Sequence, residues 1–95
     1  MNKANLDRKK AWKAEQKVLA KAAFPLPNDL LAEFFDFVEI SVGQKGCDHS
    51  RRFTEKWLAS KQVIQGPFIS WLETNVGFCD CEVAGNALQH WEENR

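Results

Sequence analysis

The stretch NDLLAEFFDFVEISV, residues 28–42, decides the fold. Apolar residues recur in it at helical spacing, and acidic residues fall on the opposite side of the helical projection. This pattern predicts a helix that buries one face in a hydrophobic core. We expect Asn28 and Asp29 to cap its first turn through their side-chain oxygens, and we expect the helix to end before Gly43. The apolar positions are Leu30, Leu31, Phe34, Phe35, Phe37, Val38 and Val42.

Helices are also predicted on both sides of this stretch. Residues 4–23 are rich in Ala, Lys and Leu, which favour helix, and Pro25 and Pro27 follow that helix as a stiff joint. A short strand near Phe78–Val83 is an alternative for the start of the last element. The fold class is therefore all-α, a small orthogonal bundle of four to five helices. On the C-terminal side, apolar spacing predicts helices over about residues 49–63, 66–77 and 82–92.

The length and cysteine count indicate the class of protein. A chain of 95 residues forms one domain with a modest core. It contains no run of roughly 20 apolar residues, which a transmembrane helix needs, and no apolar block of signal-peptide length follows its basic start. Three cysteines cannot all pair within one chain. We therefore expect a cytoplasmic protein with reduced thiols and no membrane association.

The net charge of zero hides an asymmetry along the chain. Residues 1–22 contain seven basic and two acidic residues, a balance of +5, whereas the remaining residues contain six basic and eleven acidic ones, a balance of −5. We divide the chain into a basic helical N-terminal arm, residues 1–23, and a single helical domain, residues 24–95. The arm is either a solvated helix that pairs with the body or a binding segment for nucleic acid or another polyanion.

The residue types that bind transition metals are concentrated at two places. Cys47-Asp48-His49 and Cys79-Asp80-Cys81 are separated by 29 residues, and each precedes a predicted helix. Three thiols and one imidazole are the ligands that tetrahedral zinc prefers, and four protein ligands make a closed structural site. We therefore predict a structural Zn²⁺ bound by Cys47, His49, Cys79 and Cys81. Asp48 and Asp80 occupy the positions of helix N-caps.

Other interpretations of these residues remain open. The cysteines are ordinary buried residues in one of them, and in another Cys47 forms a reversible disulfide with Cys79 or Cys81. A third uses His49, Cys79 and Cys81 with a water molecule as a catalytic zinc site, with Glu82 as base. Because the sequence contains no established catalytic motif, we assign no catalytic residue. We expect His90 to be a solvated or capping residue.

The same motifs resemble a bacterial family known as domain of unknown function 2695. The resemblance covers roughly residues 24–88, and it implies a bacterial cytosolic protein without implying an activity. The sequence departs from the family pattern at Val76, which stands before Gly77 where members usually have a glycine pair. The residues that carry the resemblance are Leu26-Pro27, the helix from Phe34 to Val38, Gly46-Cys47-Asp48-His49, Arg52, Thr54, Trp57-Leu58, Trp71-Leu72, Gly77 to Val83, and Asn86.

We therefore predict an uncharacterised small binding or regulatory module with a structural zinc site. Its partner is a protein or, through residues 1–22, a nucleic acid or other polyanion. One alternative is a redox-active or metal-dependent enzyme that uses the same Cys/His cluster. Another is a nucleic-acid-associated protein that acts through the basic arm.

Overall fold

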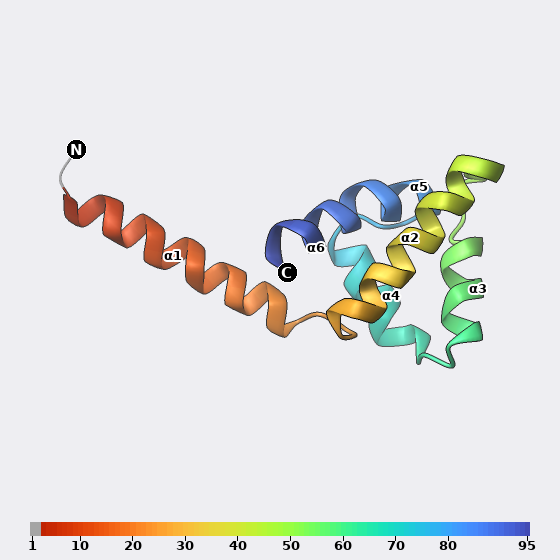
Figure 1. Ribbon diagram of the computed structural model, residues 1–95, viewed down its shortest axis with the longest axis horizontal. Coiled ribbons are helices and arrows are strands. Elements are labelled where there is room, and N and C mark those ends of the chain that lie inside the picture. Colours follow the sequence, from red (N-terminus) through yellow and green to blue (C-terminus); the bar gives the residue numbers. More distant parts are fainter. Residues whose placement is uncertain (1–2) are drawn as a thin grey trace.

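The computed structural model describes residues 3–95, with side chains from Trp12 onward. The predicted all-α class is confirmed (Figure 1). The predicted alternative of a strand near Phe78–Val83 is wrong, because the described residues contain no strand and a continuous helical segment begins at Asp80. The elements are α1 (Lys3–Ala22), α2 (Asn28–Lys45), α3 (Arg52–Ser60), α4 (Gln65–Thr74), α5 (Asp80–Glu82), a π-helical turn (Val83–Ala87) and α6 (Leu88–Asn94).

Helix α2 lies at the centre of the core, as its apolar spacing predicts. Leu31, Phe34, Phe35 and Val38 are buried on one face of this helix. Aromatic rings from the other helices pack directly on that face. The Phe34 ring lies 5.1 Å from the Trp57 ring and 4.9 Å from the Phe68 ring, and the Trp91 ring stacks on Phe35 at 5.4 Å. These large side chains supply much of the apolar area that so short a chain needs.

Both ends of α2 differ from the prediction. The helix continues through Gly43 and ends at Lys45, where Gly46 adopts φ 77° and donates its N–H to the Val42 carbonyl at 2.8 Å. A glycine inside a helix costs only about 1 kcal/mol, so Gly43 does not end α2. The expected side-chain cap is also absent at the start. Asn28 instead accepts a hydrogen bond from the Trp91 indole N–H at 3.1 Å, which ties α6 to the first turn of α2.

Helices α3 and α4 are shorter than the sequence predicts. Helix α3 begins only at Arg52, because residues 46–51 form the loop that carries Cys47. Helix α4 begins at Gln65 with Pro67 in its first turn, where proline is tolerated. It ends at Thr74, and Val76 then adopts a left-handed φ of 59°. The next residue, Gly77, has no positive φ. A glycine is needed there because a Cβ would lie 3.0 Å from the Leu72 carbonyl oxygen.

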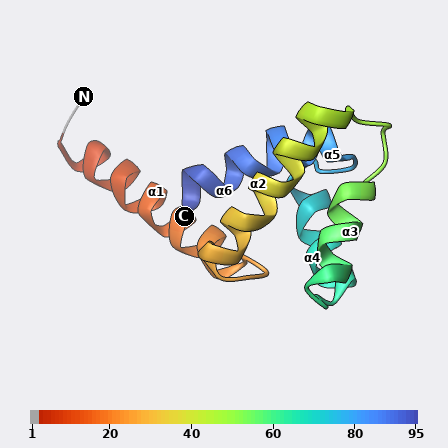
Figure 2. The same cartoon turned by 45° about the vertical axis from the view of Figure 1, so that its right-hand side comes forward.

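Helix α1 extends away from the other helices (Figures 1 and 2). It contacts α6 near its own C-terminal end, and the molecule measures 52 × 24 × 20 Å. Directly after α1, the Phe24 ring packs edge-on against Trp71 at 5.9 Å. The apolar side chains of Trp12, Val18 and Leu19 are 61%, 67% and 57% exposed. Every described helix is too short or too polar to cross a membrane.

Candidate metal centre

Three cysteines from two distant segments meet at one point of the body. Cys47 lies in the loop after α2, whereas Cys79 and Cys81 flank the first residue of α5. The three Sγ atoms lie within 4.8 Å of one another, and the Sγ atoms of Cys79 and Cys81 are 3.2 Å apart. Cys79 is buried, Cys47 is half-buried and Cys81 is exposed. We call these three residues the cysteine cluster.

A buried carboxylate holds the two segments together. Asp80 is 0% exposed. Its Oδ2 accepts the Phe53 N–H at 3.0 Å, and its Oδ1 accepts the Thr54 N–H at 3.1 Å and the Thr54 hydroxyl at 2.8 Å. These donors belong to the first turn of α3, where a negative charge is favourable. Asp80 therefore caps the helix that follows the first motif, rather than the short helix that it begins.

Main-chain hydrogen bonds fix the same junction. The Asp80 N–H donates to the Ser50 carbonyl oxygen at 2.9 Å, and the Cys81 N–H donates to the Cys47 Sγ at 3.4 Å. The sequence places an aspartate between the two cysteines, but nothing in it indicates that the partners of this side chain lie 26 and 27 residues earlier. The sequence predicted Asp80 as a helix N-cap but missed that it caps α3, and it missed the role of Thr54 as a partner of Asp80.

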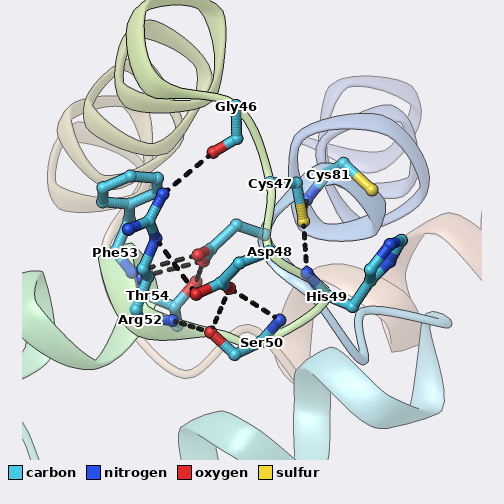
Figure 3. A network of polar contacts seen from close by, with 10 residues as sticks. Gly46, Cys47, Asp48, His49, Ser50, Arg52, Phe53, Thr54 and Cys81 are labelled. Carbon is cyan, nitrogen blue, oxygen red and sulfur yellow. Dashed lines mark hydrogen bonds and ion pairs between the residues drawn. The ribbon is translucent and has the colours of Figure 1, made fainter.

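The loop before α3 is ordered by its own acidic residue (Figure 3). Asp48 accepts hydrogen bonds from the N–H and hydroxyl of Ser50 and forms an ion pair with Arg52 at 3.5 Å. These hydrogen bonds, together with the Arg52 charge, lower the pKa of Asp48. Arg52 also donates to the Gly46 carbonyl oxygen at 3.3 Å. The two ends of the loop that carries Cys47 are therefore bridged by one guanidinium group.

The pKa values of two thiols in the cluster, Cys47 and Cys81, are shifted in opposite directions. Desolvation raises the pKa of Cys47, but hydrogen bonds from the N–H groups of Cys81 and His49 outweigh it, so the net shift is downward. The pKa of Cys81 is raised to about 12, first by hydrogen bonding to Cys79, then by hydrogen bonding to Cys47 and by desolvation. Without a cation, Cys47 therefore ionises at lower pH than Cys81 does. A divalent ion would favour thiolates throughout.

The two histidines lie in different environments. His49 is exposed, adopts a left-handed φ of 69°, and donates its main-chain N–H to the Cys47 Sγ at 3.4 Å. Its imidazole is not among the ligand atoms that lie within 4.8 Å of one another. The structure thus brings together three of the four predicted ligand side chains, and it places the backbone of the fourth beside them (Figure 3). His90 packs edge-on against the rings of Phe24 and Trp71, at 6.4 and 6.2 Å.

The chemistry of the cluster suits a soft or borderline metal ion. Thiolates select Zn²⁺, Cu⁺ and iron–sulfur clusters over Mg²⁺ or Ca²⁺. Sulfur ligands lie about 2.3 Å from zinc, which in a tetrahedron separates them by about 3.8 Å. The observed separations, 3.2 Å for one pair and at most 4.8 Å for all three, bracket that value. Small side-chain rotations would therefore give three ligand positions.

Comparison with known proteins gives the family of the chain. The sequence model of the family described as "Protein of unknown function (DUF2695)" matches residues 34–86, a span that includes both cysteine motifs. The chain belongs to this family. It is 29% identical over 76 residues to uncharacterized protein Mb2294 of Mycobacterium bovis and to uncharacterized protein Rv2271 of Mycobacterium tuberculosis. The match covers 80% of this chain and 77% of each relative. No solved structure matches the chain.

Proposed function

We propose that this DUF2695 protein is a small cytoplasmic binding or regulatory module whose helices are held together by a structural Zn²⁺. The cysteine cluster supplies three thiolate ligands and His49 supplies the fourth. The observation that carries the proposal is the convergence of three Sγ atoms within 4.8 Å from two motifs that are separated by 29 residues in the sequence. Ordinary buried cysteines need no such meeting point, whereas metal ligands do.

A structural role follows from the position of the cluster. It joins the loop after α2 to the start of the C-terminal helices, at the junction where Asp80 caps α3. An ion there would stabilise the contact between the loop after α2 and the start of the C-terminal helices. Because zinc binds the folded ligand set far better than the unfolded chain, its binding free energy stabilises the fold.

His49 is the fourth ligand in this proposal because its backbone is already anchored to Cys47. Its imidazole is exposed, and we expect it to turn toward the sulfur atoms when the metal binds. Four protein ligands leave no position for substrate or water, as expected for a structural rather than catalytic site. If His49 does not bind, the open position would favour the alternative of a metal-dependent enzyme, with the Glu82 carboxylate, 3.7 Å from the Cys79 Sγ, as the available base.

Elemental analysis of protein purified without added chelator tests the proposal directly. We expect about one zinc per chain, and we expect a chelator to lower the thermal unfolding midpoint at neutral pH. Cys79→Ser and Cys81→Ser should each lose the metal, and His49→Ala should bind it more weakly. His90→Ala is the matched control, because His90 packs against aromatic rings away from the cluster, and it should retain full metal content.

The contrary result is equally specific. A structural zinc would be excluded if the purified protein contained no metal and a chelator left its unfolding midpoint unchanged. The position of Cys47 Sγ within 4.8 Å of the Cys79 and Cys81 Sγ atoms would then favour the redox alternative, in which Cys47 forms a reversible disulfide with one of them. Mass spectrometry of alkylated protein would distinguish a reversible disulfide, which blocks two thiols after mild oxidation, from three inert cysteines.

A further inference from the structure

Helix α1 exposes apolar side chains that a solvated arm does not need. Trp12, Val18 and Leu19 are each more than half exposed, and α1 extends away from the body (Figure 2). Helices in proteins are stabilised mainly by packing of an amphipathic face, and isolated helices are marginal in water. The contact of α1 with α6 lies near its C-terminal end. The exposed face of α1 therefore requires a partner.

One side of α1 is basic and matches an acidic face elsewhere in the same chain. Lys13, Lys17 and Lys21 recur every four residues, lie on one side of α1 and are exposed. They span about 12 Å along the helix axis at 1.5 Å per residue. Among the described side chains, the ion pairs are Arg51–Glu73, Arg52–Asp48 and Lys61–Glu33, so none of them uses these three lysines.

The matching face lies on the solvent side of α2. Asp29, Glu33, Asp36 and Glu39 are all exposed there, and Ile40 among them is 59% exposed. A groove of about 280 Å³ adjoins this stripe between α2 and α3. Its apolar lining comes from Phe37, Ile40 and Phe53.

We propose that α1 of one chain docks along the acidic face of α2 in a second copy of the same chain, so that two chains exchange arms in a symmetric dimer. The lysines of α1 would lie over Asp36 and Glu39, with Val18 against Ile40. Leu19 and Trp12 would fill the adjoining groove. A two-fold axis makes both contacts identical, so each arm of +5 meets a body of −5.

A second copy is favoured over the other occupants by charge and geometry. Pairing of two α1 helices would bring like charges together, and an extended polyanion bound to the arm would meet a body of charge −5. Folding of α1 back onto its own α2 would break the packing of Phe24 against Trp71 and His90. Docking of α1 on a second copy keeps the packing of Phe24, and the chain does not have to bend between α1 and α2. The groove lies in the C-terminal half of α2, the end that leads to the loop of Cys47, so the metal content of each variant must be measured beside its dimerisation.

Charge reversal in the full-length chain tests the dimer. We expect the wild type to sediment as a dimer in low salt across the micromolar range and to dissociate in high salt. The arm variant Lys13→Glu/Lys17→Glu and the α2 variant Asp36→Lys/Glu39→Lys should each weaken dimerisation at least about tenfold. An equimolar mixture of the two should restore the dimer, because each reversed arm then faces a reversed α2.

Controls separate the proposal from its alternatives. Glu92→Lys/Glu93→Lys, on the exposed side of α6, changes the net charge as much as the α2 variant does and should leave the dimer intact. Circular dichroism should show that all variants are folded, and elemental analysis should show that their metal content is unchanged. A monomeric wild type, including one that binds a DNA duplex through the arm, would overturn the proposal. So would an α2 variant that remains a dimer, because the arms would then pair with each other.

Discussion

Asp80 shows how much one side chain determines at this site. Its carboxylate satisfies three donors in the first turn of α3 and is completely buried. Buried donors left without an acceptor are costly, whereas a satisfied network makes the local structure unique. Cys79 and Cys81 flank this residue directly, so the position of two sulfur atoms depends on an interaction that involves neither of them.

We expect Asp80→Asn to lower the free energy of unfolding by about 1–3 kcal/mol. The amide keeps one acceptor oxygen, but its NH₂ group would face the Phe53 N–H and leave that donor unsatisfied. Denaturant unfolding measures the change. Asp48→Asn is the control, because Asp48 is exposed and its removal leaves no buried donor without a partner. Equal losses for the two variants would contradict the capping role of Asp80.

The thiol acidities lead to a second prediction, for protein from which metal has been removed. Thiolates rather than thiols react with alkylating reagents, so Cys47, with its lowered pKa, should be alkylated before Cys81, whose pKa is raised to about 12. Exposure alone predicts the reverse, because Cys81 is the more exposed residue. Timed alkylation followed by peptide mass spectrometry gives the order. Faster labelling of Cys81 would refute the hydrogen-bonding pattern described for Cys47.

The same shifts determine how stability depends on pH. The raised pKa of Cys81 favours the thiol in the folded state, so its contribution is present below the unfolded pKa, about 8.5, and is lost as pH rises toward 12. Cys47 acts in the opposite sense, because its contribution is lost as pH falls through its lowered pKa. The metal-free protein should therefore lose stability above about pH 8.5, and Cys81→Ser should reduce that alkaline loss.

At the level of elements, two glycines near the C-terminal end of α2 have different roles, because Gly43 lies inside the helix and Gly46 follows it. A Cβ on Gly43 would meet nothing within 4 Å, and this residue lies inside the helix. Gly43→Ala should therefore stabilise the protein by about 0.5–1 kcal/mol. Gly46→Ala should destabilise it by about 1–2 kcal/mol, because Gly46 adopts a left-handed φ of 77°. Thermal unfolding of both variants measures the effects, and the same sign for both would contradict this assignment.

The turn after α4 gives the complementary case. Val76 is β-branched and adopts φ 59°, whereas Gly77 has no positive φ. Val76→Gly should raise the free energy of unfolding by up to about 1 kcal/mol, because released backbone strain exceeds the entropy gained by the unfolded chain. Gly77→Ala should lower it, since the added Cβ would lie 3.0 Å from a backbone oxygen of Leu72 and 3.2 Å from Val83. A destabilised Val76→Gly variant would show that the valine side chain matters more than its strain.

For the whole molecule, features that depend on neighbouring residues could be predicted from the sequence, whereas contacts between distant residues could not. The core face of α2 and the Pro25–Pro27 break followed from periodicity and backbone restriction, which act over one or two helical turns. The predicted end of α2 was wrong because the cost of one glycine inside the helix is smaller than the gain from continuing the helix to Lys45. The partners of Asp80 lay beyond any local signal. The orientation of the His49 side chain depends on a left-handed backbone that no motif specifies.

The capping of α3 from a distant segment also affects the order of folding during synthesis. Helix α3 has nine residues, too few for stability in isolation, and its cap arrives only when Asp80 has been translated. The indole of Trp91, still later in the chain, bonds to Asn28 at the start of α2. A ribosome makes the chain from the N-terminus, so both contacts form only after α1, α2 and α3 have all been synthesised. We therefore expect α1 and α2 to remain exposed to chaperones and neighbouring nascent chains until Asp80 and Trp91 have left the ribosome.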